Sequence, residues 1–569
     1  MTSLNRRRFI QAALATTGSV AISTPLSTPL QAMTRPQLPS EVSFVHGVAS
    51  GDPLQDAVIL WTRATPMDSN PAGPVRVNWE LAADAAFKNV VRRGSVETDL
   101  ARDYTAKIDV RGLKPNTSYY YRFVGASEQS PTGRTKTLPE KGVEQVKLAV
   151  FSCSNYPAGY FNAYQLAAQA DHWDAVLHLG DYIYEYGAGG YATEKSAEIG
   201  RALPEDNRGE ILSLTDYRKR YALYRTDAGL QALHAAAPFI AVWDDHEITN
   251  DTWKAGAENH SADEGDFFAR RAAAVQAYYE WLPIRPPMGD RHPQIYRSFR
   301  FGDLVDLHML DTRVIGRDQQ LQFASYMDEQ GNLDAQTFAA DMASPTRTLL
   351  GKSQREWLRQ TLTESNAHWQ LLGQQVLMGK MHLPVELMTS FYRGGNKNLT
   401  AELIDLKAAS LRGEPLSPEQ QARLQRQVPY NLDAWDGYAA EREDLYRHMR
   451  TLGKNIAVVA GDTHNAWFNH LKDSDGQMVG LEFGTPSVTS PGMETYLKLD
   501  ERAAQELARG MSVLVDDLQY CNLHQRGYMS LTFRRDGVEA EWKYVDNIET
   551  TEFAEAGSHK VFHSLLQSV

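Results

Sequence analysis

Four short segments of the chain carry side chains that commonly bind metal ions, and each directly follows an apolar run. The segments are residues 151–155, 180–184, 243–247 and 461–465, and their ligand-type side chains are Cys153, Asp181, Tyr184, Asp245, His246, Asp462 and His464. In α/β proteins, loops at the ends of neighbouring strands meet at one edge of the sheet, where active sites are built. The four segments together predict one metal site, and the chemistry we expect there is metal-assisted hydrolysis of a phosphoester.

Asp181 and Tyr184 come from the second of these segments. Gly180 lets the backbone turn at the end of the apolar run, and the two oxygens of Asp181 can then bridge two metal ions. The ions of two-metal sites lie about 3.5–4 Å apart, a spacing that one carboxylate spans. Tyr184 can return to the same site as a phenolate, which suits ferric iron better than magnesium. The alternative is that Asp181 caps a following helix and Tyr184 belongs to the core.

Cys153 lies in the first segment. A thiolate ligand selects softer transition metals over calcium or magnesium, so a metal shared by Cys153, Asp181 and Tyr184 is expected to be iron. Two alternatives remain open: Cys153 is a small buried hydrophobic residue, or it forms a disulfide with Cys521, the second of the two cysteines. We expect a free Cys153 that binds metal.

The last two segments add acids and histidines. Asp245 and Asn250 offer oxygens of the kind that a calcium-like ion prefers. His246 between them can stabilise charge on a phosphoryl oxygen or protonate a leaving group. Asp462 and His464, two residues apart, can reach two neighbouring metals. The alternatives are a charged, solvated loop at residues 243–251 and a turn with a hydrogen-bonded histidine at residues 461–464.

The elements that position these residues are predicted strands. Apolar runs at residues 146–151, 175–179, 238–242 and 456–460 precede the four segments. From about residue 143, such strands alternate with helical patterns at 163–170 and 269–281, and further strands are expected at residues 304–310, 369–377 and 529–533. This pattern predicts an α/β fold, an α/β/β/α sandwich over residues 143–569. Polar, partly helical insertions are expected at residues 318–345 and 402–427.

Residues 41–140 have a different pattern. Short alternating runs recur at residues 58–62, 75–80, 107–110 and 119–123, with turn-forming residues between them. This spacing predicts a small all-β sandwich that resembles a fibronectin type III module. The polar stretch at residues 137–142 is the expected boundary.

Length, charge and the N-terminus limit the class of protein. A chain of 569 residues is long enough for more than one domain, and its net charge of −13 argues against stable binding to nucleic acid. The twin arginine in residues 5–11, followed by an apolar stretch to residue 30, resembles a bacterial Tat signal peptide over residues 1–32. The alternative is a disordered basic tail. We expect Tat export to the periplasm or beyond, no integral membrane segment and a monomer.

The set of motifs is similar to the PhoD family of alkaline phosphatases and phosphodiesterases, within the metallophosphoesterase superfamily. Further segments that carry the resemblance are residues 310–313, 435–438, 482–487 and 490–492. The resemblance implies a site with Fe3+ and Ca2+, in which Cys153, Tyr184 and His464 hold iron and Asp181 bridges. Asp462, with Asp245 or Asn250, would help to hold calcium. Arg225 would contact phosphate, or else be a surface residue of a helix.

One departure from the wider superfamily concerns the second metal. Many members have a further histidine ligand on the strand before the last motif, where residues 372–377 here contain Gln374 and Gln375. The glutamines imply a second metal that prefers oxygen and weaken the case for zinc.

Other functions remain open from the sequence. Phospholipase D-type cleavage of lipid head groups uses the same chemistry. A calcium-stabilised, non-enzymatic binding protein and a haem-free iron redox protein are the alternatives outside hydrolysis. The C-terminal residues 550–569, with Phe553, Val561, Phe562 and Leu565, either cover the site or complete the core.

Overall fold

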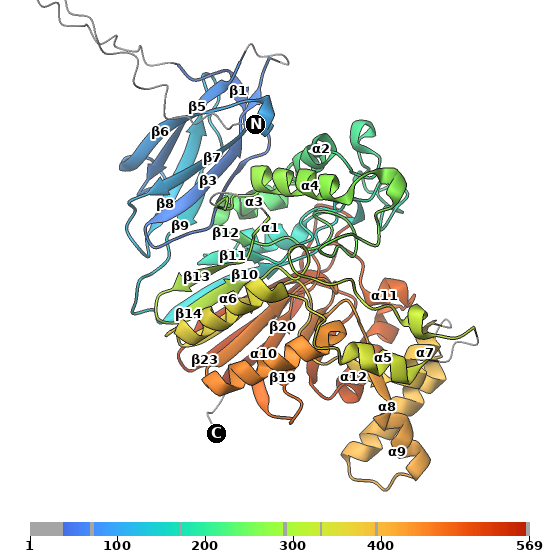
Figure 1. Ribbon diagram of the computed structural model, residues 1–569. Helices are drawn as coiled ribbons and strands as arrows, with labels where there is room; N and C mark the ends of the chain where they lie inside the picture. Colours follow the sequence, from blue (N-terminus) through green and yellow to red (C-terminus); the bar gives the residue numbers. More distant parts are fainter. Residues whose placement is uncertain are drawn as a thin grey trace, which may run out of the picture. The chain divides into compact units, whose positions relative to one another are not determined.

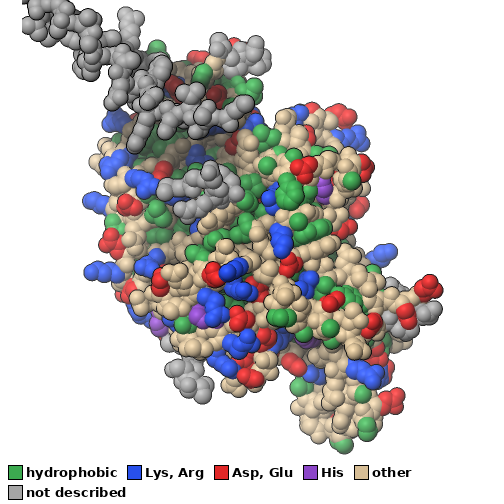
Figure 2. Space-filling view, in the orientation of Figure 1, with side chains coloured by type: hydrophobic (Ala, Val, Ile, Leu, Met, Phe, Trp, Pro, Cys, Tyr) green, Lys and Arg blue, Asp and Glu red, His purple; other side chains and the backbone are tan. Residues whose placement is uncertain are grey.

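The computed structural model describes residues 38–68, 73–170, 172–287, 293–329, 333–392 and 396–564 (Figure 1). The predicted export signal at residues 1–32, and Leu565 near the other end, lie outside the described residues. In the described part of the chain, no helix is long and apolar enough to cross a membrane. On the face seen in Figure 2, basic and acidic side chains are interspersed.

Two large β-sheets form the centre of the molecule. The nine-stranded sheet has the order β24-β23-β22-β10-β11-β12-β2-β3-β7, and the seven-stranded sheet has the order β13-β14-β15-β18-β20-β19-β21. The strands of the first sheet that matter for the site are β10 (Gln145–Phe151), β11 (Ala175–His178), β12 (Phe239–Ala241), β22 (Arg526–Arg534), β23 (Gly537–Val545) and β24 (Glu555–Ser564). Those of the second are β13 (Arg297–Phe301), β14 (Val305–Met309), β15 (Trp369–Gly373), β18 (Asn455–Ala460), β19 (Ala466–Lys472), β20 (Met478–Gly484) and β21 (Leu518–Asn522).

The two sheets pack face to face through one apolar core. Val150 and Leu177 from the first sheet and Leu371 and Val459 from the second belong to the same buried cluster. Helices α1 (Asn162–Ala168), α2 (Leu214–Tyr224), α3 (Ala228–Ala236) and α4 (Phe267–Trp281) contribute to this cluster on one side. A second cluster joins the outer face of the seven-stranded sheet to α6 (Gly351–Glu364), α10 (Ala439–Leu452) and α12 (Glu501–Leu514). The predicted α/β/β/α arrangement is confirmed (Figure 1).

Most predicted strands and helices agree with the structure to within two residues at each end. The exceptions are the run at residues 529–533, where β22 begins earlier at Arg526, and the run at residues 369–377, where β15 ends at Gly373. The chain turns there because the next two side chains, Gln374 and Gln375, bond to other loops: Gln374 accepts from the Trp435 indole at 2.9 Å, and Gln375 donates to the Trp243 carbonyl at 2.6 Å.

The N-terminal strands form the expected all-β sandwich. One layer is β6-β5-β8-β9, formed by β5 (Val75–Ala82), β6 (Val90–Thr98), β8 (Ser118–Val124) and β9 (Gly133–Lys136). The other layer is β2 (Val48–Gly51), β3 (Ala57–Arg63) and β7 (Thr105–Arg111), and it continues the nine-stranded sheet because Gly51 pairs with Phe239 of β12. A side chain at Gly51 would lie 2.4 Å from the Pro283 carbonyl oxygen, so this junction requires glycine.

The insertions and the C-terminal segment lie around this frame. Helix α5 (Ala335–Met342) lies in the first predicted insertion, and α8 (Lys397–Leu411) and α9 (Pro418–Gln425) lie in the second. The described part of the C-terminal segment forms β24, the edge strand of the nine-stranded sheet. Val561 packs partly on the core, whereas Phe562 is 53% exposed. The segment therefore extends the sheet.

Candidate metal centre

The four predicted segments meet at one edge of the paired sheets. Strands β10, β11 and β12 are parallel neighbours, so the residues after them lie side by side, and Cys153 donates its backbone N–H to the Gly180 carbonyl at 3.2 Å. Residue 152 forms a bridge with Ser487 of the loop that follows β20, which joins the two sheets at this edge. Convergence of strand ends therefore positions the ligand-type side chains.

Three overlapping groups of side chains have metal-ligand geometry. Within each group, one ligand atom per residue lies within 4.8 Å of the others. The first group joins a thiol, a carboxylate and an imidazole, the second joins two carboxylates and an imidazole, and the third has only carboxylates. They are Cys153, Asp181 and His464; Asp181, Asp245 and His246; and Asp244, Asp245 and Asp462. Because Asp181 and Asp245 each belong to two groups, the three groups form a continuous row of ligand-type side chains.

The backbone is strained at this row. Cys153, Asp181, Asp462 and His464 all have positive φ, between 55° and 63°. This left-handed region is uncommon for residues other than glycine, and such residues gather at active sites, where tertiary structure holds them. Gly180, before Asp181, has φ 111°, and a Cβ there would lie 2.3 Å from the Asp244 Cβ. The close approach of the two loops therefore needs glycine.

Tyr184 lies between two of the predicted iron ligands. Its hydroxyl donates to Asp181 Oδ2 at 2.9 Å and lies 3.3 Å from His464 Nε2. Ser490 Oγ donates to the same phenol oxygen at 2.6 Å, and the Pro491 carbonyl lies 2.7 Å from His464 Nδ1. The loop after β20, which contains Ser490 and Pro491, thus fixes the orientation of the Tyr184 and His464 rings.

Burial makes this half of the site unfavourable for anions. It raises the pKa of the Cys153 thiol and of the Tyr184 phenol well above their usual values, and the Asp181 charge raises both further. Thiol and phenol deprotonate at such a place when a cation lies among them. The donor set of sulfur, phenol oxygen, imidazole and carboxylate fits a transition metal.

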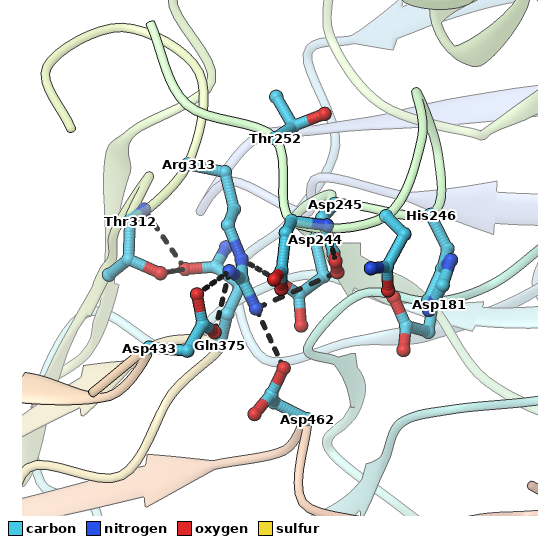
Figure 3. A network of polar contacts seen from close by, with 12 residues as sticks. Asp181, Asp244, Asp245, His246, Thr252, Thr312, Arg313, Gln375, Asp433 and Asp462 are labelled. Atoms are coloured by element: carbon cyan, nitrogen blue, oxygen red, sulfur yellow. Dashed lines mark hydrogen bonds and ion pairs between the residues drawn. The ribbon is translucent and has the colours of Figure 1, made fainter. Parts of the chain in front are cut away.

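A network centred on Arg313 occupies the other half (Figure 3). Its fully buried guanidinium donates to Asp244 Oδ1, to Asp433 Oδ1 at 2.9 Å and to Asp462 Oδ1 at 2.6 Å, and it lies 3.6 Å from Asp245 Oδ1. Figure 3 shows these carboxylates directed toward the guanidinium from several loops. Arg317 also pairs with Asp433, so two guanidiniums face four carboxylates, and the surroundings still favour further positive charge.

The hydrogen bonding and the pKa values of the carboxylates show whether this half of the site fits cations. Asp181 Oδ1 and Asp244 Oδ2 are buried and have no hydrogen-bond partner in the structure. Burial raises the pKa of Asp462 to about 7, partly offset by Arg313 and reinforced by Asp433. Burial also disfavours ionised Asp245, yet Arg313 and His246 lower its pKa to about 2. Unpaired buried carboxylate oxygens of this kind fit hard divalent cations.

His246 is held by a buried carboxylate. Its Nδ1 lies 2.7 Å from Glu185 Oε2, and Glu185 Oε1 accepts the backbone N–H of Asn250 at 2.8 Å and the Asn259 amide at 3.0 Å. Burial lowers the pKa of His246, but the charges of Glu185 and Asp245 outweigh it and raise that pKa well above its usual value. The pair fixes the ring and leaves Nε2 for other partners.

Glu247 joins the two loops that carry the acids. Its buried carboxylate accepts backbone N–H groups of Asp181 at 3.0 Å, Tyr182 at 2.6 Å and Asp244 at 2.7 Å. These amides belong to the loops after β11 and β12. The carboxylate therefore fixes the spacing of those loops.

Replacing Glu247 by Ala is expected to lower the free energy of unfolding by about 2–4 kcal/mol, because three buried amides lose their acceptor. Urea denaturation measures the change. Glu198→Ala, at an exposed position, is the matched control and should change stability by less than about 0.5 kcal/mol. Equal effects of the two substitutions would show that Glu247 does not fasten the loops.

Two predicted site residues have other partners. Arg225 is fully buried at the end of α2, stacks on Trp61 at 4.4 Å and donates to the His46 carbonyl at 3.1 Å. It is therefore not a surface residue, and its position does not support a phosphate contact. The Asn250 side chain donates to Glu258 Oε2 at 3.0 Å, and its backbone N–H bonds to Glu185, the partner of His246.

The sequence reasoning missed several residues that structure places in the site: Glu185, Asp244, Glu247, Arg313 and Asp433. Arg313 follows β14 just as Asp181 follows β11, so the strand-end criterion applied to every strand would have found it. Asp244 adjoins a predicted ligand. Asp433 follows no strand of the paired sheets and carries no such signal.

The glutamines after β15 are satisfied by protein groups. Gln375 accepts from the Thr312 hydroxyl at 2.6 Å (Figure 3). It also donates to the Leu310 carbonyl at 3.0 Å, in addition to its bond with Trp243. It therefore acts as a link between strand ends.

Both cysteines are free and buried. Cys521 Sγ lies 3.4 Å from the Ala508 carbonyl, in the outer core beside α12. Cys153 and Cys521, which both lie in the described part of the chain, therefore do not form the disulfide considered from the sequence.

Comparison with known proteins agrees with this geometry. The family model PhoD-like phosphatase matches residues 148–542, and the model of the PhoD-like phosphatase N-terminal domain matches residues 31–139. Alkaline phosphatase D from Bacillus subtilis (strain 168) is 36% identical over 506 residues, which cover 86% of this chain and 77% of that protein. The solved structure of PhoD superposes with a TM-score of 0.72 at 32% identity and covers 92% of this chain and 91% of that one.

These matches decide between the functional classes left open by the sequence. The chain is an enzyme, a metal-dependent phosphoric ester hydrolase, and the readings as a non-enzymatic binding protein or a redox protein are set aside. This chain belongs to the PhoD-like phosphatase family.

Proposed function

We propose that the chain is an exported alkaline phosphatase or phosphodiesterase that uses one Fe3+ and Ca2+. Cys153, Tyr184 and His464 would hold iron, Asp181 would bridge, and Asp245 and Asp462 would hold calcium. The observation that carries the proposal is the continuous row of ligand groups, which passes from a set with sulfur and nitrogen to a set of carboxylates. Such a change in donor type suits two different ions.

Some of the earlier assignments change with the geometry. Asp244, with an unpaired buried oxygen, replaces Asn250 as the further calcium ligand. Arg225 is no longer assigned to phosphate, and Arg313 is the residue that positions the carboxylates, because its fully buried guanidinium is hydrogen-bonded to Asp244, Asp433 and Asp462. We keep the division into residues 41–140 and 143–569, the Tat signal at residues 1–32, periplasmic or extracellular location and a monomer as part of the proposal.

When bound, the ions would supply the positive charge that attracts a phosphate ester and the acidity that makes a water nucleophilic near neutral pH. Arg313 presents a planar set of donors that binds several carboxylates at once. Its hydrogen bonds to Asp244, Asp433 and Asp462 fix these side chains before cations or substrate arrive. Groups that orient metal ligands in this way affect both metal affinity and activity.

His246 is the proposed proton donor to the leaving alcohol. Glu185 holds Nδ1, so the proton that moves is the one on Nε2. The ring stacks near Tyr184, with centroids 4.2 Å apart, and this contact and the Glu185 bond leave it one orientation. Glu185 itself is fully buried and is a positioning residue.

Elemental analysis tests the proposal. The full chain is purified folded from the periplasm without added metal or chelator, and its hydrolysis of a phosphodiester is assayed. About one iron per chain with calcium, and activity lost on chelation, is the expected result. Zinc or manganese without iron would overturn the assignment of Cys153 and Tyr184. A metal-free protein that is fully active would overturn the proposed function.

Replacing His246 by Ala is expected to lower kcat for an alkyl phosphodiester by about 10²–10⁴-fold and for an aryl ester much less, because a good leaving group needs no proton. Glu185→Gln should show the same pattern more weakly. His172→Ala, at an exposed position, is the control. Equal losses on the alkyl and the aryl ester would contradict the role in protonation.

A further inference from the structure

Three tyrosines lie beside the metal centre without belonging to the proposed ligand set. We call Tyr186, Tyr191 and Tyr496 the tyrosine rim. The first two stand in the loop after Asp181, and the third ends α11 (Met493–Tyr496). Two separate parts of the chain thus bring phenol rings to one place.

Direct contacts connect the rim to the site. Tyr191 Oη lies 3.2 Å from His464 Nδ1 and 3.1 Å from the Pro491 carbonyl, and the ring stacks 5.9 Å from that of Tyr184. The Tyr186 ring lies 5.5 Å from the His246 ring and 5.7 Å from the Tyr191 ring. The rim is therefore next to the residues that face the reacting phosphate.

Tyr496 forms the outer part of the rim. Its hydroxyl donates to Tyr191 Oη at 3.2 Å, while the residue as a whole is 63% exposed. The hydroxyl of Tyr496 is thus held on the side of the site by Tyr191, and the residue remains largely exposed to solvent.

The hydrogen bonds decide what kind of group the rim fits. The hydroxyls of Tyr191 and Tyr496 bond to each other, and Tyr191 also contacts the Pro491 carbonyl and His464. Their polar ends are thus engaged, and what they present to a ligand is mainly ring surface. Ring surface attracts other planar rings through stacking, whereas a polyol such as glycerol needs free donors and acceptors.

We propose that the tyrosine rim is a subsite for a planar ring-bearing group, aryl or nucleoside, esterified to the substrate phosphate. This proposal rests on the proposed function, because the phosphate must lie at the adjoining metal centre. Tyr496 is the specificity-determining residue, and it acts on binding of the esterified group.

Calorimetry with two phosphonates tests the subsite in the full chain with its metals as purified. Phenylphosphonate and cyclohexylphosphonate carry the same charge and nearly the same size, but only the first is planar. The wild-type chain should bind phenylphosphonate about 10-fold more tightly, as expected for one stacked ring. Tyr496→Ala should bring the ratio of the two dissociation constants close to one.

Two further variants serve as controls. Tyr496→Phe keeps the ring and should keep the preference, and Phe268→Ala removes a ring that is 51% exposed on α4 and should leave the ratio unchanged. A preference that persists in Tyr496→Ala, or that is lost equally in Phe268→Ala, would overturn the subsite. Thymidine 5′-methylphosphonate distinguishes the sources: if its affinity also falls about 10-fold in Tyr496→Ala, the group is a nucleoside, and if only phenylphosphonate weakens, it is an aryl group.

Hydrolysis of an alkyl phosphodiester separates this proposal from the proposed function. Phe268→Ala, which lies outside the rim, should hydrolyse that substrate with wild-type kcat/KM and gives the reference activity. A wild-type chain that binds phenylphosphonate selectively but hydrolyses no ester would refute the proposed function and leave the subsite supported. A chain that hydrolyses the alkyl ester but binds both phosphonates equally would refute the subsite alone.

Discussion

Replacing Asp181 by Ala is expected to abolish ester hydrolysis and to remove bound metal. Asp181 belongs to two of the three ligand groups, so its loss damages both halves of the site. We expect at least about a 10³-fold fall in kcat/KM, since metal ions supply several kcal/mol of charge stabilisation. Steady-state kinetics and elemental analysis on the same sample measure the two losses together.

Without bound metal, the same substitution should increase the stability of the protein, although it abolishes activity. Asp181 Oδ1 is buried without a partner, and burial raises the pKa of this carboxyl well above its usual value. Removing such a group relieves an unfavourable charge, so Asp181→Ala without metal should unfold at a higher temperature than the metal-free wild type. Asp56→Ala, an exposed position, is the control. An active Asp181→Ala enzyme with its full metal content would refute the model of the site.

Replacing Arg313 by Ala is expected to cost the metal-free protein about 3–5 kcal/mol of stability, because removing one partner of a buried ion pair leaves charge unpaired. Asp244, Asp433 and Asp462 would all lose a hydrogen-bonded donor. Hydrolysis should also fall by about 10–100-fold, as when a group that orients metal ligands is removed. Chemical denaturation with and without calcium, together with kinetics, measures both effects.

Comparison with Arg317 separates the two roles of Arg313. Arg317 is equally buried, but among the carboxylates of the site it contacts only Asp433. Arg317→Ala should therefore destabilise the chain while reducing kcat/KM by less than 10-fold. Added calcium should restore much of the stability of Arg313→Ala but not its activity. A variant with normal kcat/KM and reduced stability would show that Arg313 serves folding alone.

The sequence by itself determined the architecture and most of the side chains that meet at the candidate metal centre. Apolar runs such as residues 146–151 and 456–460 have the length of buried strands, and polar residues directly after them are placed by the strand ends. Cys153, Asp181, Tyr184, Asp245, His246, Asp462 and His464 therefore come together in the structure, as expected. The all-β pattern of residues 41–140 could also be predicted, because the alternation of apolar and polar residues and the turn-forming residues all lie within that segment.

Only the tertiary structure decided which side chains complete the site. The roles of Glu185, Glu247 and Arg313 depend on which loops face one another across the two sheets. The sequence pattern of one segment does not show which distant segments it will contact. Arg225 shows the same limit: the sequence left open a phosphate contact or a surface position on a helix, whereas the structure buries it against Trp61, in a strand more than 150 residues away. Strand order and loop packing set these contacts, because their energies arise between segments that are distant in sequence.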